Sequence, residues 1–111
     1  MKLFTKAQHA RLLSNGSTRR EHGTRPVVKL FTPDAQCTWL LSEIDPGDPD
    51  QAFGLCDLGM GSPELGYVSL AELRSVRGKL RLPIERDRHF RPVKTLADYA
   101  REAWDAGRIT A

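Results

Sequence analysis

The sequence ERDRH places two carboxylates and an imidazole at alternate positions, Glu85, Asp87 and His89. Because successive side chains of a β-strand point to opposite faces, these three would share one face of an extended segment. Two carboxylates and an imidazole can bind a divalent metal ion or transfer protons in acid–base catalysis. One strand supplies only part of such a site, which Asp57 and Glu64 would complete if their strands lie alongside. The competing interpretation is a solvated edge where the acids pair with neighbouring arginines.

A dense run of basic side chains covers the same part of the chain. Eight Lys and Arg residues fall within residues 74–94, and only Glu85 and Asp87 offset them. Such a run can follow a phosphate backbone, although a solvated surface without a partner has the same composition. Phe90 and Trp104 would stack on bases if exposed, but the position of Trp104 on an apolar helix face predicts that it is buried. The eight candidate nucleic-acid-binding residues are Arg74, Arg77, Lys79, Arg81, Arg86, Arg88, Arg91 and Lys94.

Charge is segregated into three blocks along the chain. Residues 1–31 contain seven Lys or Arg and one acid, and residues 32–72 contain eight acids and no Lys or Arg. Residues 73–111 contain ten Lys or Arg and five acids. Two interpretations follow: the acidic and basic blocks pair with each other, or the surface is bipolar, with a basic face for phosphate and an acidic face for a protein or a metal.

The two cysteines, Cys37 and Cys56, are too few for a disulfide framework or a four-cysteine zinc site. If the strands on either side of residues 45–50 form a hairpin, the two positions come close to facing each other. We interpret them as two small buried thiols of a reducing cytosol, with a redox pair as the alternative.

Two short motifs are interpreted as turns. The segment DPGDPD (residues 45–50) resembles a calcium loop only in its acids, because its prolines are typical of turns. The segment GMGSP (residues 59–63) lacks the Lys-Ser/Thr and the following helix of a phosphate-binding loop. It is therefore expected to connect two strands.

Hydrophobic periodicity predicts a single small α+β domain over residues 1–111. Its short, mainly antiparallel sheet has about four to five strands, at residues 27–31, 38–44, 51–58 and 64–68 and in an extended stretch within residues 82–90, and three helices surround it. The first helix begins at Thr5 and stops at Asn15-Gly16, and residues 14–26 form a flexible loop. The second helix begins at Ser69 and ends at Gly78, and the third runs from Thr95 to Gly107.

Four segments are similar to an uncharacterised bacterial domain family carried mainly on conjugative plasmids and integrative elements. They are VVKLFTPDA (residues 27–35), TWLLSEIDP (38–46), FGLCDLGMGSPELGYVSLAEL (53–73) and PIERDRHF (83–90). The resemblance covers nearly the whole chain. It implies a bacterial cytoplasmic protein of a mobile element, and it supplies no catalytic residue.

Two hypotheses about function follow. We favour a non-enzymatic accessory protein of a mobile element that binds nucleic acid or a host protein through its charge-segregated surface. The alternative is a small metal-dependent hydrolase or nuclease that uses Glu85, Asp87 and His89 with Asp57. No apolar run approaches the length of a membrane helix, no secretory signal is expected, and we assign no cofactor and no structural metal site.

Overall fold

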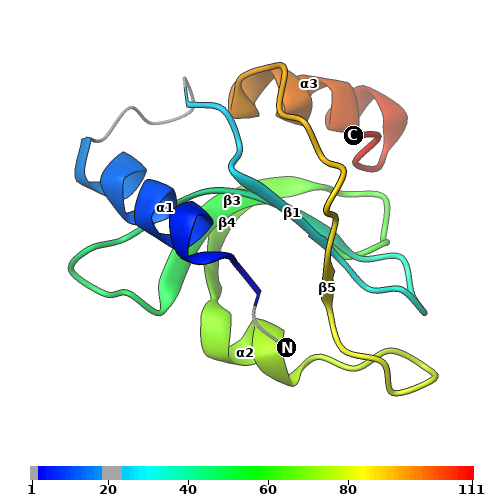
Figure 1. Ribbon diagram of the computed structural model, residues 1–111. Helices are drawn as coiled ribbons and strands as arrows, with labels where there is room; N and C mark the ends of the chain where they lie inside the picture. Colours follow the sequence, from blue (N-terminus) through cyan, green and yellow to red (C-terminus); the bar gives the residue numbers. More distant parts are fainter. Residues whose placement is uncertain (1–2, 19–23) are drawn as a thin grey trace.

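The computed structural model describes residues 3–18 and 24–111, and its strands form one antiparallel sheet (Figure 1). The strands are β1 (Val28–Phe31), β2 (Thr38–Ile44), β3 (Gln51–Asp57), β4 (Glu64–Ser69) and β5 (Glu85–Arg86), in the spatial order β4-β3-β2-β1-β5. The helices are α1 (Lys6–Thr18), α2 (Leu70–Ser75) and α3 (Leu96–Ala106). The predicted α+β class, with an antiparallel sheet and three helices, is confirmed.

Each face of the sheet packs against helices. On one face, α1 and α2 cover an apolar cluster that includes Leu12, Leu41 and Leu73. On the other face, α3 covers a second cluster that includes Leu40 and Leu55. The neighbours Leu40 and Leu41 enter different clusters because side chains alternate along a strand. Figure 1 accordingly shows α3 on one side of the sheet and α1 with α2 on the other.

Helix α1 begins as predicted but does not end as predicted. Thr5 and Gln8 form a reciprocal capping box, with each side chain accepting a hydrogen bond from the other residue's backbone N–H. The predicted stop at Asn15-Gly16 is wrong, because these residues pack the helix against the end of β2. The Asn15 side chain donates to the carbonyl of Ser42 at 2.9 Å, and a Cβ at Gly16 would overlap the carbonyl of Ile44.

The predicted flexible loop at residues 14–26 is therefore wrong for residues 14–18, which are helical. Residues 24–26 lead into β1, and Thr24 accepts a hydrogen bond from the N–H of Leu96 at 2.9 Å. The remainder of that predicted loop, residues 19–23, lies outside the described residues. Within the described part of the chain, no helix is both long enough and apolar enough to cross a bilayer.

Helix α2 ends earlier than the predicted stop at Gly78. Ser69 caps it as expected, since its side chain accepts from the N–H of Glu72. The last helical residue is Ser75, and Val76 follows in extended conformation. Gly78 does not end the helix; it lies in the next loop, where a Cβ would overlap the carboxylate of Asp34.

Helix α3 has the predicted caps but not the predicted buried tryptophan. Thr95 accepts from the N–H of Asp98, and Gly107 takes the left-handed conformation at the C-cap. Trp104 is 53% exposed, and its indole N–H donates to the carbonyl of Pro63 at 2.8 Å. At about 100° per residue, Trp104 lies about 80° around the helix from Leu96 and so falls at the rim of the apolar stripe.

Candidate nucleic-acid interface

The predicted basic residues follow one continuous segment that begins with Arg74 in the last turn of α2 and runs to the start of α3. The segment leaves α2 on one side of the sheet, passes β5 at the sheet edge, and reaches α3 on the other side (Figure 1). Strand β5 is held at this edge by antiparallel pairing with β1, where Arg86 is the partner of Leu30. We call the eight cations of this segment the basic strip: Arg74, Arg77, Lys79, Arg81, Arg86, Arg88, Arg91 and Lys94.

Most of the basic strip faces solvent. Arg86 and Lys94 are half-buried, and the other six residues are exposed. Within residues 3–18 and 24–111, three ion pairs form, and Lys94 with Glu102 is the one that includes a residue of the strip. Lys94 Nζ also lies 5.6 Å from the centre of the Tyr99 ring. In the described part of the chain, seven cations of the strip thus lack a carboxylate partner.

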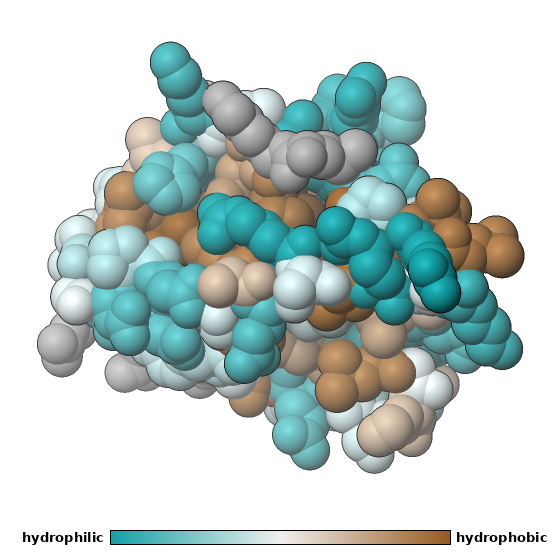
Figure 2. Space-filling model, turned by 90° about the horizontal axis from the view of Figure 1, so that it is seen from below, coloured by the Kyte–Doolittle hydropathy of each residue, from teal (hydrophilic) through white to brown (hydrophobic). Residues whose placement is uncertain are grey.

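Figure 2 shows the molecule from below, the side on which α2 lies in Figure 1. Hydrophilic side chains form a broad band across this face of the molecule, and hydrophobic surface lies above it at the left, below it and at its right-hand end (Figure 2). Exposed side chains of both kinds come from the segment after α2, where Leu80 is 73% exposed beside Lys79 and Arg81.

This segment closes into a tight loop, residues 77–83, which we call the finger. Its base is an antiparallel bridge between Arg77 and Pro83. Inside it, the N–H of Gly78 donates to the carbonyl of Leu82 at 3.3 Å, and the N–H of Arg81 donates to the carbonyl of Gly78 at 2.9 Å. Figure 1 shows the loop (yellow) projecting at the lower right, away from the helices and the sheet.

Asp34, in the turn between β1 and β2, anchors the finger. Its Oδ2 accepts hydrogen bonds from the N–H groups of Leu80 at 2.6 Å and Leu82 at 3.4 Å. Arg81 adopts φ of 63°, a left-handed conformation that is uncommon for residues other than glycine. The finger is therefore held in one backbone conformation by a carboxylate 46 residues away in sequence from Leu80.

The aspartates of the acidic block bind backbone N–H groups, a role that differs from the expected pairing between blocks. Asp45 accepts from Gly47, Asp48 from Asp50, and Asp50 from Ala71 and the Ser69 hydroxyl. None of these three, nor Asp34 or Asp57, takes part in the three ion pairs above. The interpretation of residues 45–50 as a turn is confirmed, and residues 59–63 connect β3 to β4 as predicted.

The Asp50 carboxylate has a lowered pKa. The hydrogen bond from the Ser69 hydroxyl is the main cause, followed by the bond from the N–H of Ala71, while Arg74 adds a smaller electrostatic contribution. This carboxylate joins the β2–β3 turn to the first turn of α2. Its role is to fix α2, and with it the start of the basic strip.

The proposed acid–base group is only partly brought together. Glu85, Asp87 and His89 line one cavity of about 360 Å³, together with Phe31 and the intervening arginines. The expected alternation along a strand is wrong here, because β5 ends at Arg86 and Asp87 starts a turn by accepting from the N–H of His89 at 2.8 Å. Asp87 also pairs with Lys29, at 3.5 Å.

Asp57 and Glu64 do not complete this group. Glu64 begins β4, which is the opposite edge of the sheet from β5, so three strands separate them. The buried Asp57 carboxylate accepts from the N–H of Gly59 at 2.8 Å and from the N–H of Ile109 at 2.9 Å. No group of three or more His, Cys, Asp or Glu residues within the described ranges is arranged to hold a metal ion.

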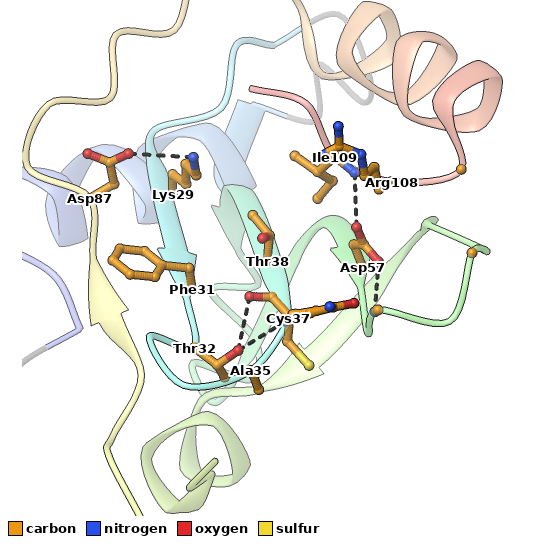
Figure 3. A pocket seen from close by; sticks show the side chains of 14 residues that line it. Lys29, Phe31, Thr32, Ala35, Cys37, Thr38, Asp57, Asp87, Arg108 and Ile109 are labelled. Carbon is orange, nitrogen blue, oxygen red and sulfur yellow. Dashed lines mark hydrogen bonds and ion pairs between the residues drawn. The ribbon is translucent and has the colours of Figure 1, made fainter. Parts of the chain in front are cut away.

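Asp57 instead forms one wall of a cavity of about 600 Å³ that the sequence analysis did not identify (Figure 3). The opposite side carries the pair of Lys29 and Asp87, and Arg108 and Ile109 come from the segment after α3. The cavity is assembled from four separate parts of the chain, so no local motif marks it. Both of its carboxylates are already bound, Asp57 by backbone N–H groups and Asp87 by Lys29.

The two cysteines are free thiols, and each is half-buried. Cys56 is the register partner of Trp39, and both cysteines pack against the cluster under α1 and α2. Burial raises the pKa of the Cys56 thiol to about 11, with a further contribution from the charge of Glu64. Because its thiolate is disfavoured, Cys56 has the properties of a small apolar side chain.

The two aromatic residues considered for base stacking do not lie on the exposed strip. Phe90 packs against the cluster under α3, with its ring 6.2 Å from that of Tyr99. Trp104 is exposed, but its bond to Pro63 places it beside the start of β4, at the edge opposite β5. The candidate interface is therefore cationic and aliphatic.

Comparison with known proteins identifies a family. The family model described as protein of unknown function (DUF2958) matches residues 3–110, so the chain belongs to this family. No curated protein and no solved structure matches the chain.

Proposed function

We propose that this member of the DUF2958 family is a non-enzymatic module that binds nucleic acid electrostatically through the basic strip. The observation that carries the proposal is the set of seven exposed or half-buried cations without a carboxylate partner in the described part of the chain. Cations arranged in this way neutralise phosphates and release the counterions condensed on the nucleic acid. The resemblance to proteins of conjugative plasmids and integrative elements suggests the nucleic acid of the element or of its host as the partner.

The position of the acidic side chains supports this proposal. Five aspartates of the acidic block accept backbone hydrogen bonds in turns, in loops and at the start of α2: Asp34, Asp45, Asp48, Asp50 and Asp57. None of them forms an ion pair with a cation of the strip within the described residues. The strip also follows a largely irregular segment that passes the sheet at its β5 edge.

The test is fluorescence anisotropy with labelled duplex DNA, single-stranded DNA and single-stranded RNA at several salt concentrations. The longest dimension of the domain is 38 Å. Since successive base pairs are about 3.4 Å apart, probes of about 20 base pairs exceed one footprint. We expect the logarithm of the binding constant to fall linearly with the logarithm of the salt concentration. The slope should be no steeper than about −6, the value for seven phosphate contacts at about −0.9 each.

Single substitutions then map the interface. Arg81→Ala and Arg88→Ala should each reduce the steepness of the salt slope by about one. Arg101→Ala removes the same charge from α3, where Arg101 pairs with Asp98, and should leave the slope unchanged. Absence of binding to all three probes at low salt would contradict the proposal and make a host protein the favoured partner.

A further inference from the structure

We propose that the finger, residues 77–83, inserts Leu80 as an apolar wedge into the minor groove of duplex DNA. This inference rests on the proposed function and adds the element that would deform the duplex. Minor-groove proteins commonly pair cationic side chains with an inserted apolar residue such as leucine, which partly unstacks one base step. The finger presents this combination, since Lys79 and Arg81 flank an exposed Leu80.

Leu80 is the most exposed leucine among the described residues. The Leu80 side chain is 73% exposed, and that of Leu82 is 42% exposed. Arg81, between them, is held by the hydrogen bond from its backbone N–H to the carbonyl of Gly78. Asp34 binds the N–H of Leu80 directly and so fixes the position from which its side chain projects. An exposed leucine between two cations is suited to a partner with a groove that has negatively charged edges and an apolar interior.

Duplex DNA has this character in its minor groove. Phosphates line the groove on both sides, and an apolar side chain can enter between base pairs where the stack opens. Phe90, which lies in the same segment, packs against the cluster under α3 and so does not offer an exposed ring of the kind on which single-strand binding proteins stack bases. The structure thus favours the duplex over single strands.

The rigid backbone of the finger is the second part of the inference. A wedge must be held in place to transmit force to a base step, and a loop that is ordered beforehand loses less conformational entropy on binding. Asp34 supplies this order, together with the left-handed conformation of Arg81. Removing the Asp34 carboxylate should therefore weaken binding to the duplex, even though the substitution removes a negative charge.

The experiment measures duplex affinity and bending with a 20-base-pair probe that carries a dye at each end and a central TA step. Leu80→Ser should lower affinity about fivefold to tenfold and abolish a kink of about 20–90°. Val93→Ser is the matched control, because Val93 is 65% exposed in the same segment but outside the finger, and should leave both readouts unchanged.

Two substitutions at Asp34 separate loop order from charge. Asp34→Ala and Asp34→Asn remove the same charge, but the asparagine oxygen can still accept from the N–H of Leu80. Electrostatics alone would make both variants bind more tightly than the native protein. The wedge predicts that Asp34→Ala binds more weakly than Asp34→Asn, with folding of each checked by thermal denaturation.

The outcomes are distinguishable. Salt-dependent duplex binding that Leu80→Ser leaves intact would overturn the wedge and leave the proposed function standing. Failure of every nucleic-acid probe to bind would overturn both. Binding to phosphatidylserine vesicles that depends on Leu80, without binding to the duplex, would also overturn the wedge and assign the finger to a membrane surface.

Discussion

The carboxylate of Asp57, at the end of β3, accepts a hydrogen bond from the backbone N–H of Ile109 at 2.9 Å. The same carboxylate accepts from Gly59 at 2.8 Å, so one buried side chain joins the β3–β4 connection to the segment that follows α3. A buried acceptor of this kind satisfies backbone groups that water cannot reach. Asp57 is thus a structural residue, although its position on a cavity wall resembles that of a catalytic one.

Asp57→Ala should destabilise the domain by about 1–3 kcal/mol, because two backbone donors lose their acceptor. Urea denaturation followed by circular dichroism measures this change. Asp105→Ala is the matched control, since Asp105 is exposed in the last turn of α3. That carboxylate lies at the unfavourable end of the helix dipole, so its removal should be neutral or stabilising. Equal effects of the two substitutions would contradict the role given to Asp57.

The Asp50 carboxylate should make the domain sensitive to acid. Its pKa is lowered from 3.8 by the bonds from Ser69 and Ala71, so the folded state binds this proton less readily than the unfolded state. The stabilisation is present above pH 3.8 and is lost as pH falls through the lower folded value. Asp50→Asn should therefore show a smaller loss of melting temperature than the native protein between about pH 4 and pH 2.

Asp48→Asn is the control for this measurement, because Asp48 lies in the same turn and accepts one longer bond, at 3.4 Å. If both variants retain the acid sensitivity of the native protein, the Asp50 contacts do not fix α2.

The Cys56 thiol should react slowly with alkylating agents. With a pKa of about 11, about one molecule in a thousand carries the thiolate at pH 8. Alkylation by iodoacetamide in a Cys37→Ser background should accelerate about tenfold per pH unit up to about pH 10. Rapid reaction of Cys56 at pH 8 would show that this thiol is more accessible to water than its packing implies.

The raised pKa of the Cys56 thiol also lowers the stability of the folded domain at high pH. The unfolded thiol titrates near 9.0 and the folded thiol near 11, so the unfolded state loses its proton first. Stability is fully present below pH 9 and declines between pH 9 and pH 11. Cys56→Ala should remove this part of the decline, measured as the difference between the two melting curves. The other titrating groups contribute equally to both proteins.

Gly107→Ala should destabilise the C-terminal end of α3 by about 1 kcal/mol, because a Cβ disfavours the left-handed conformation. The φ angle of Gly107 is 76°. Gly66→Ala in β4 is the comparison, since no atom lies within 4 Å of the added Cβ. This second change should be neutral or slightly stabilising through the unfolded state. Thermal denaturation distinguishes the two, and a larger effect at Gly66 would contradict the assignment.

Local patterns predicted much of the secondary structure. The strand at residues 38–44 and the caps at Thr5, Ser69 and Thr95 have the predicted positions, because alternation and capping depend on neighbours within a few residues. The errors at Gly16 and Gly78 have a common cause, because each residue packs against a distant partner, Ile44 and Asp34 respectively. Trp104 lies instead at the rim of the apolar stripe of α3, where its indole reaches the carbonyl of Pro63.

The sequence by itself determined the α+β class, the order of the elements and the density of cations between residues 74 and 94, since these depend on composition and local periodicity. The tertiary structure alone decided which charges meet. The strand order placed Glu64 at the edge opposite Glu85, and it brought Asp34 beneath Leu80 and Asp57 against Ile109. Hydrogen bonds across 46 and 52 residues depend on how strands and loops pack, and no local pattern encodes that packing.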